Sequence, residues 1–110
     1  MGRMTCVALA GAFAFTGSLA VRANDTGFAS SHTLRREGGR TCFADHWHGG
    51  NASAGSKVVA YTAAMKIWYD TTAGEYGSDW AKWGKSAGKK IAYAKSADTW
   101  TATVDSRPCK

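Results

Sequence analysis

The residues of this chain that best suit chemistry are Asp45-His46-Trp47-His48, which follow Cys42 after two intervening residues. Residues two apart in an extended segment project to the same face, so both imidazoles should point the same way. Zinc and copper favour imidazole, carboxylate and thiolate ligands, and Asp45 or Cys42 would complete the set. The segment therefore predicts a zinc or copper site. The alternatives are a pair of structural or surface histidines, or a catalytic role for the segment.

The first 23 residues have the pattern of an export signal. Arg3 precedes an apolar run from Cys6 to Ala20, and Val21-Arg22-Ala23 has small residues at its first and third positions. Cleavage is predicted after Ala23, with Ala20 as the alternative. The apolar run is shorter than the ~20 residues that a membrane span needs. We therefore expect no transmembrane segment after signal removal and a periplasmic or extracellular protein.

Removal of this signal would leave two cysteines, Cys42 and Cys109. In the oxidising compartment that export implies, two cysteines in a small domain are expected to pair. Closing so long a loop would stabilise the fold by roughly 4 kcal/mol in the chain-entropy model. A disulfide between Cys42 and Cys109 is therefore predicted.

The remaining chain divides into two parts. Residues 24–41 are rich in Ser, Thr, Gly and charge without hydrophobic periodicity, which predicts a flexible basic arm. Residues 42–110 contain every tryptophan and predict a single small α+β domain. Within this domain, the Gly-, Asn- and Ser-rich stretch that follows His48 predicts a loop.

Two helices are predicted in the middle of the domain. Ser56 is a good N-cap, and Ala60, Ala64, Ile67, Trp68 and Thr71 follow at helical spacing, with Gly74 as the expected end. Ser78 should cap a shorter helix that buries Trp80 and Trp83. The opposite face of this short helix would carry a row of lysines at positions 82, 85 and 89.

From Lys89 to Asp105 the apolar pattern alternates with period two, which predicts a β-hairpin. A turn around Ala97-Asp98 would place Ile91 opposite Val104, and Tyr93 opposite Ala102. The threonines of the second strand should face water. The predicted fold class is therefore α+β, with one long and one short helix packed on a two-stranded antiparallel hairpin and stapled by a disulfide.

The basic residues predict a second kind of site. Lysines interleaved with aromatic residues would attract anionic envelope polymers, lipid headgroups or an acidic protein, whereas an exported chain seldom meets nucleic acid. The alternative is a solvated lysine face. The lysines of this predicted anion-binding surface are Lys82, Lys85, Lys89, Lys90 and Lys95.

Catalytic patterns are weak in this sequence. It has three histidines, no recognisable Ser-His-acid arrangement and no glycine-rich phosphate loop. Carboxylate pairs drawn from Asp70, Glu75 and Asp79 are of a kind that any chain offers. We therefore expect a protein that is not an enzyme.

Several of these residues together resemble a family of small exported bacterial proteins with no established activity. The resemblance covers Cys42 to Lys110 and rests on Cys42, Asp45-His46-Trp47-His48-Gly49, Trp68, Glu75-Tyr76-Gly77, Trp80-Ala81 and Arg107-Pro108-Cys109. The family usually has two further cysteines, at positions matching Tyr93 and Ala102. The predicted hairpin makes these positions direct neighbours, so their joint absence is what loss of one disulfide would leave. The resemblance implies no mechanism.

These observations predict a small exported, disulfide-stabilised protein. Its leading predicted function is that of a non-enzymatic binding module at the cell envelope, which uses the basic and aromatic surface. The alternative is zinc or copper binding through Asp45, His46 and His48.

Overall fold

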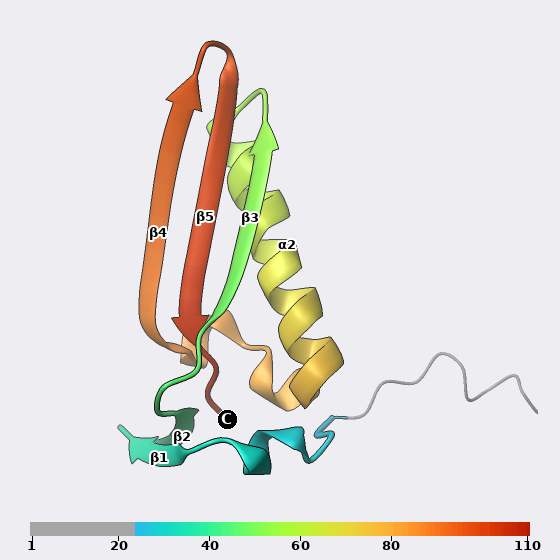
Figure 1. Ribbon diagram of the computed structural model, residues 1–110, viewed down its shortest axis with the longest axis vertical. Coiled ribbons are helices and arrows are strands. Elements are labelled where there is room, and N and C mark those ends of the chain that lie inside the picture. Colours follow the sequence, from blue (N-terminus) through green and yellow to red (C-terminus); the bar gives the residue numbers. More distant parts are fainter. Residues whose placement is uncertain (1–23) are drawn as a thin grey trace, which may run out of the picture.

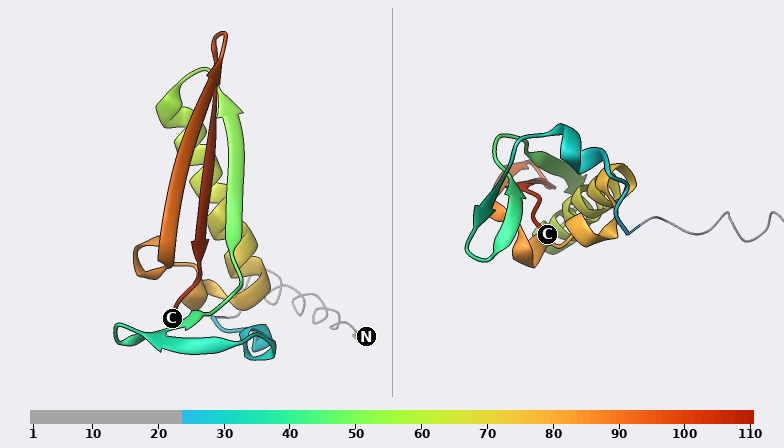
Figure 2. Two further views of the ribbon diagram at one scale, coloured as in Figure 1. Left: turned by 60° about the vertical axis from the view of Figure 1, so that its left-hand side comes forward. Right: turned by 90° about the horizontal axis from the view of Figure 1, so that it is seen from below.

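The computed structural model describes residues 24–110, so the predicted export signal lies outside the described part. One helix, α2, packs across a three-stranded antiparallel sheet of order β3-β5-β4, and a small two-stranded sheet, β1-β2, lies across the base (Figures 1 and 2). The α+β fold class is confirmed. The elements are β1 Leu34–Glu37, β2 Arg40–Phe43, β3 His48–Ala54, α2 Lys57–Tyr76, β4 Ala87–Ser96 and β5 Thr99–Arg107, with 3-10 turns η1 Phe28–Ser31, η2 Ser78–Trp80 and η3 Trp83–Lys85.

The predicted hairpin is confirmed in both extent and register. Strand β4 pairs with β5 so that Ile91 lies opposite Val104, and Tyr93 opposite Ala102. Ala102 and Val104 are fully buried against α2, while the alternate threonines of β5 lie on the opposite, more exposed face. The period-two pattern therefore predicted which side of the sheet the helix covers.

The sheet has a third strand where a loop was predicted. Strand β3 pairs with β5 along its whole length, and hydrogen bonds join Asn51 to Thr103 (2.7 Å) and Ser53 to Thr101 (2.7 Å) on the exposed face. Gly50 faces the helix, where a Cβ atom would clash with the carbonyl oxygen of Ala64. Glycine is therefore required in this strand because the strand and helix backbones meet there.

Helix α2 begins as predicted and ends later. The Ser56 hydroxyl accepts a hydrogen bond from the Val59 amide (3.2 Å), which satisfies one of the free amides of the first turn. The helix continues through Gly74 and ends at Gly77, whose φ of 108° favours glycine. The predicted end at Gly74 is wrong because Tyr76 is buried at the base, which favours continuing the helix for two more residues.

The buried stripe of α2 follows the prediction only in its first half. Ala60, Ala64 and Trp68 are fully buried, but Ile67 is 39% exposed and Thr71 is exposed. The stripe continues instead through a set of residues that faces β3 and the base, namely Thr72, Ala73 and Tyr76.

The predicted second helix is two separate 3-10 turns, η2 and η3. The reason lies in where the two tryptophans pack. Trp80 joins a cluster with Phe43 and Tyr76, whereas Trp83 packs edge-on against Trp68, with ring centroids 5.3 Å apart. The chain must turn between the two clusters, so a continuous helix does not form. The predicted row of lysines at helical spacing therefore does not exist.

Residues 24–41 form regular structure where a flexible arm was predicted. The Gly38-Gly39 pair, with φ of 59° and 83°, makes the tight turn between β1 and β2. Before β1, the backbone of residues 24–26 contacts the end of α2: the Thr26 amide donates to the Tyr76 carbonyl (3.0 Å), and the Asp79 amide donates to the Asn24 carbonyl (2.9 Å). This segment therefore closes the base of the molecule.

The predicted disulfide between Cys42 and Cys109 is confirmed, and both cysteines are fully buried. It joins β2 to the C-terminal segment, and reciprocal backbone hydrogen bonds between Thr41 and Lys110 (2.9 and 2.7 Å) reinforce the connection. Within residues 24–110, no helix has both the length and the apolar character needed to cross a membrane.

Candidate metal centre

The three histidines of the chain meet at the base of the molecule. His32 precedes β1, His46 lies between β2 and β3, and His48 is the first residue of β3. The ring centroids of His46 and His48 are 5.1 Å apart, and those of His32 and His46 are 4.5 Å apart. The neighbouring placement of the His46 and His48 rings agrees with the prediction that they share a face.

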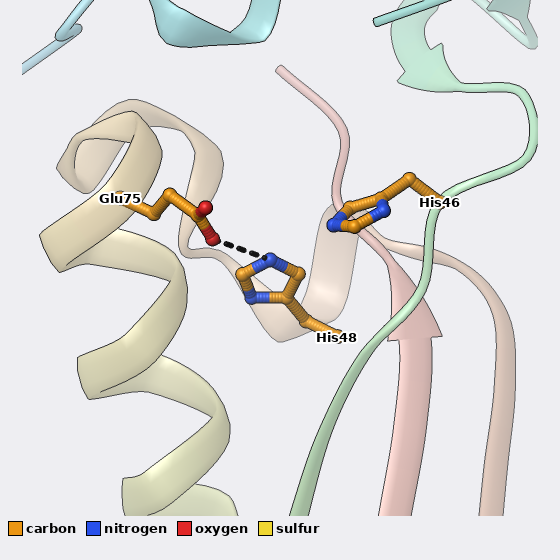
Figure 3. A group of neighbouring side chains, drawn as sticks. All are labelled: His46, His48 and Glu75. Carbon is orange, nitrogen blue, oxygen red and sulfur yellow. Dashed lines mark ion pairs between the residues drawn. The ribbon is translucent and has the colours of Figure 1, made fainter.

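Glu75, in the last turn of α2, completes this group. Its Oε1 atom is 3.2 Å from Nε2 of His48, and one ligand atom from each of His46, His48 and Glu75 lies within 4.8 Å of the others (Figure 3). Asp45 is not a member of this group, and Cys42 is held in the disulfide. The structure therefore assembles two histidines and Glu75, rather than the histidines with Asp45.

His48 is the anchored member of the group. Its side chain is 8% exposed, and its Nδ1 atom is 3.0 Å from the hydroxyl of the fully buried Thr72, one turn before Glu75. Burial lowers the pKa of His48, although the carboxylate of Glu75 opposes this effect. The neutral imidazole is the form in which histidine binds a metal.

The Thr72 hydroxyl suits both forms of the site because it can donate or accept a hydrogen bond. When Nε2 of His48 carries the proton and donates to Glu75, the hydroxyl donates to Nδ1. When Nε2 binds a metal, Nδ1 carries the proton and donates a hydrogen bond to the hydroxyl oxygen. Such a partner on the second ring nitrogen orients a metal-ligating histidine.

Tyr76 and His32 support the group from the other side. The Tyr76 hydroxyl is 3.1 Å from Nε2 of His32, whose ring stacks on Phe43 and lies against His46. Burial raises the pKa of Tyr76 to about 12, so its hydroxyl remains a proton donor at neutral pH. These contacts restrict the His46 ring, which is only partly buried.

The spacing of the three side chains is close to that of a metal site. In tetrahedral zinc with bonds of about 2.0–2.2 Å, the ligand atoms lie roughly 3.4 Å apart. The His48–Glu75 distance of 3.2 Å is already close to this value. All three ligand atoms lie within 4.8 Å of one another, so a short movement of His46 or Glu75 would bring the set to tetrahedral spacing. The Glu75 side chain is 55% exposed and free to make it. Three protein ligands leave a fourth position for water.

The predicted anion-binding lysines are all exposed, but they do not form one surface. Lys90 lies over the ring of Trp47 on one face of the sheet, and Lys95 lies over Trp100 on the other. The Nζ atom of Lys89 contacts the Ser86 carbonyl oxygen (3.0 Å). The structure thus separates residues that the predicted helix would have aligned. The set is distributed over the link between η2 and η3, η3 itself and β4: Lys82, Lys85, Lys89, Lys90 and Lys95.

Comparison with known proteins gives no match: no family model, no curated protein and no solved structure is similar to this chain. The resemblance to the exported bacterial family stays a prediction.

Sequence reasoning missed three residues around the site, namely Glu75, Thr72 and His32. Thr72 and Glu75 are three apart in α2, the spacing that places helical side chains side by side, so the helix offered a local signal. His32 joins the group only because the Gly38-Gly39 turn folds β1 back on β2. That dipeptide is a recognised hairpin signal.

Proposed function

We propose that this protein binds one zinc or copper(II) ion through His46, His48 and Glu75. The observation that carries this proposal is the convergence of three ligand atoms within 4.8 Å from two separate parts of the chain. Two imidazoles and a carboxylate, with a water in the fourth position, are a donor set known for zinc, and imidazole nitrogen also suits copper(II).

Three features of the surroundings support this proposal. Burial lowers the pKa of His48 and so favours its neutral form, and the Thr72 hydroxyl can accommodate the change of tautomer that frees Nε2 for a metal. Glu75 supplies negative charge that partly offsets that of a divalent ion. Finally, β3 and α2, which carry His48 and Glu75, are in backbone contact at Gly50 and Ala64, so their separation is fixed before any ion binds.

The open fourth position favours an exchangeable ion over a structural one. Structural zinc sites are closed by four protein ligands, whereas here the disulfide already joins the two ends of the domain. A site of this kind would accept an ion from another ligand and release it again. For a protein of the predicted envelope location, that role is metal binding or metal transfer.

The alternative of an envelope-binding module that uses all five predicted lysines has less support. This prediction depended on lysines aligned along one helix. In the structure the lysines lie on different elements and on both faces of the sheet. The part of this idea that the structure favours concerns β4 alone.

The proposal is tested by isothermal titration of the purified, oxidised protein with zinc and with copper(II). We expect one ion per chain with a sub-micromolar dissociation constant, and tighter binding of copper(II), as the general order of divalent metals predicts. The His46→Ala/His48→Ala double variant should lose this binding. Glu75→Gln should weaken it while leaving the fold intact, because Glu75 is exposed.

Asp45→Asn is the matched control, since it removes a neighbouring carboxylate that lies outside the group. Its affinity should equal that of the unchanged protein. Near-ultraviolet circular dichroism of each variant would show that the aromatic base remains folded. Undiminished binding by the double variant, or the absence of binding in the unchanged protein, would refute the proposal.

A further inference from the structure

Strand β4 is an edge strand that the rest of the protein leaves uncovered. Helix α2 packs on β3 and β5, and from Gly88 to Ser96 every residue of β4 is exposed (Figure 1). An edge strand presents a row of backbone amides and carbonyls that have no partner on its outer side. These groups are the usual template for the addition of another strand.

The helix-facing side of β4 is apolar as well as exposed. Ile91 and Tyr93 lie opposite the buried residues Val104 and Ala102, so they point to the same side as the core. They nevertheless remain 45% and 38% exposed, because α2 packs mainly on β3 and β5 and reaches Tyr93 only with the side chain of Lys57. An apolar side chain from an added strand would bury both residues further.

Three lysines lie around β4, and one of them, Lys90, has Asp105 as its cross-strand neighbour. The Nζ atom of Lys57 lies 4.4 Å from the ring centroid of Tyr93, and that of Lys95 lies 5.3 Å from the ring centroid of Trp100. Lys90 projects from the opposite face of the strand. Among residues 24–110, the ion pairs include none of these three lysines. Their charges therefore favour a partner that carries carboxylates.

The same charges disfavour a second copy of this chain. Antiparallel pairing of two β4 strands would bring Lys89, Lys90 and Lys95 of each copy onto one ribbon, and like charges on neighbouring strands repel. Lysines on an edge strand are a common means of preventing such self-association.

We propose that β4 is a docking site for an extended acidic peptide segment of another protein, which adds to the sheet as a fourth strand. The segment would alternate acidic and apolar residues. Its apolar side chains would pack on Ile91 and Tyr93, and its carboxylates would lie on the opposite face with Lys90. Lys57 and Lys95, on the side of Ile91 and Tyr93, would attract the acidic segment at longer range. This proposal is independent of the metal site, which lies at the base.

The test uses a capped ten-residue peptide of alternating glutamate and valine, titrated into the isotopically labelled protein and followed by NMR. The amide signals of β4 should shift, and affinity should decrease as salt is raised. A peptide with lysine in place of glutamate should not bind. Two further peptides carry N-methyl groups on alternate amides, in opposite phase. Strand addition uses one edge of the peptide, so one phase should abolish binding and the other should retain it.

The protein variants separate β4 from the general positive charge. Lys90→Glu/Lys95→Glu should weaken binding at least ten-fold. The matched control, Lys82→Glu/Lys85→Glu, changes the net charge equally outside β4 and should bind within two-fold of the unchanged protein. Equal binding of both N-methylated peptides, an equal loss in both variants, or binding only to vesicles of anionic lipid would each overturn the proposal.

Discussion

The base of the molecule and its β4 edge are built in opposite ways. At the base, segments from residues 24 to 110 that are distant in sequence meet through the disulfide, through Arg107 and through aromatic rings packed edge-on against Tyr76. At the β4 edge, pairing with β5 is the main contact that holds the strand, and its lysines form no ion pair within the described residues. Contacts within the protein hold the base together, whereas the backbone of β4 has a hydrogen-bonding partner only on the side that meets β5.

This difference separates two tasks. A metal site needs ligands held at fixed distances, and the cross-linked base supplies them. A docking site for an extended segment needs free backbone groups, and the edge strand supplies those. The following predictions break the contacts that organise the base and set it apart from the β4 edge.

The largest expected effect on the base follows from removal of the disulfide. The Cys42→Ser/Cys109→Ser variant should lose roughly 4 kcal/mol of unfolding free energy, because a link across a separation of 67 residues no longer restricts the unfolded chain. Chemical denaturation of the variant and the oxidised protein measures this loss. If reducing agent lowers the stability of the unchanged protein but not of the variant, the effect belongs to the disulfide.

The next effect concerns the contact that holds β3 against α2. Gly50→Ala places a methyl group against the Ala64 carbonyl, and overpacking of this kind destabilises a core by about 1–3 kcal/mol. It should also weaken metal binding, because it separates His48 from Glu75. Calorimetric unfolding and metal titration of the same variant test both outcomes.

Gly74→Ala is the matched control for this prediction. Gly74 lies within α2, and an added Cβ meets nothing within 4 Å. Alanine is more favourable than glycine in a helix interior by about 1 kcal/mol, so this variant should be more stable than the unchanged protein. Destabilisation by Gly74→Ala would show that the end of α2 is packed differently from the structure described.

Thr72→Val tests the support of the metal ligand without removing any ligand. The substitution keeps the shape of the side chain but removes the hydroxyl 3.0 Å from Nδ1 of His48. Loss of such a partner typically lowers metal affinity about 10–100-fold. Isothermal titration measures the change, and Thr71→Val, on the exposed side of the helix, should leave affinity unaltered.

The smallest effect is a change in acid sensitivity at the β1-β2 hairpin. Hydrogen bonds from Arg107 lower the pKa of Glu37 from 4.5 to about 2. Because folding lowers this pKa, the stabilising effect of the carboxylate is complete above 4.5 and disappears as the pH falls toward 2. Glu37→Gln should therefore flatten the decrease in stability over this range.

Denaturation midpoints measured at several pH values would show this difference. Asp70→Asn serves as the control, because it also removes a carboxylate, but one paired on the exposed face of α2 with Lys66. An identical pH dependence of Glu37→Gln and the unchanged protein would mean that the Arg107 contact has no influence on folding.

The features predicted correctly from sequence depend on local pattern or on composition. Alternation of apolar residues defines the hairpin register, Ser56 defines the start of α2, and two cysteines allow one pairing. The third strand was missed because Gly50 lacks the side chain on which such patterns depend. The short helix was wrong because its tryptophans have separate packing partners, which are visible only in three dimensions.

Of the candidate metal ligands, the two histidines were predictable from local pattern, whereas Glu75 was not. The spacing of His46 and His48 places both on one face, which sequence reasoning established. Glu75 reaches them only because α2 is long enough to return to the base, and this length depends on the burial of Tyr76. Asp45 was the nearer carboxylate in sequence, but it lies outside the group that the fold assembles.

The closure of the base has a practical consequence for work with this protein. The Thr26 side chain donates to the Glu75 carbonyl (2.7 Å), and Lys110 pairs with Asp25 (2.6 Å), so residues from both ends of the described chain lie beside the candidate metal site. A polyhistidine tag joined before Asn24 or after Lys110 would bring competing imidazoles to the ion under study. The turn at Ala97-Asp98 is at the far end of the hairpin, and a purification tag inserted there would keep its own ligands away from the measurement (Figure 1).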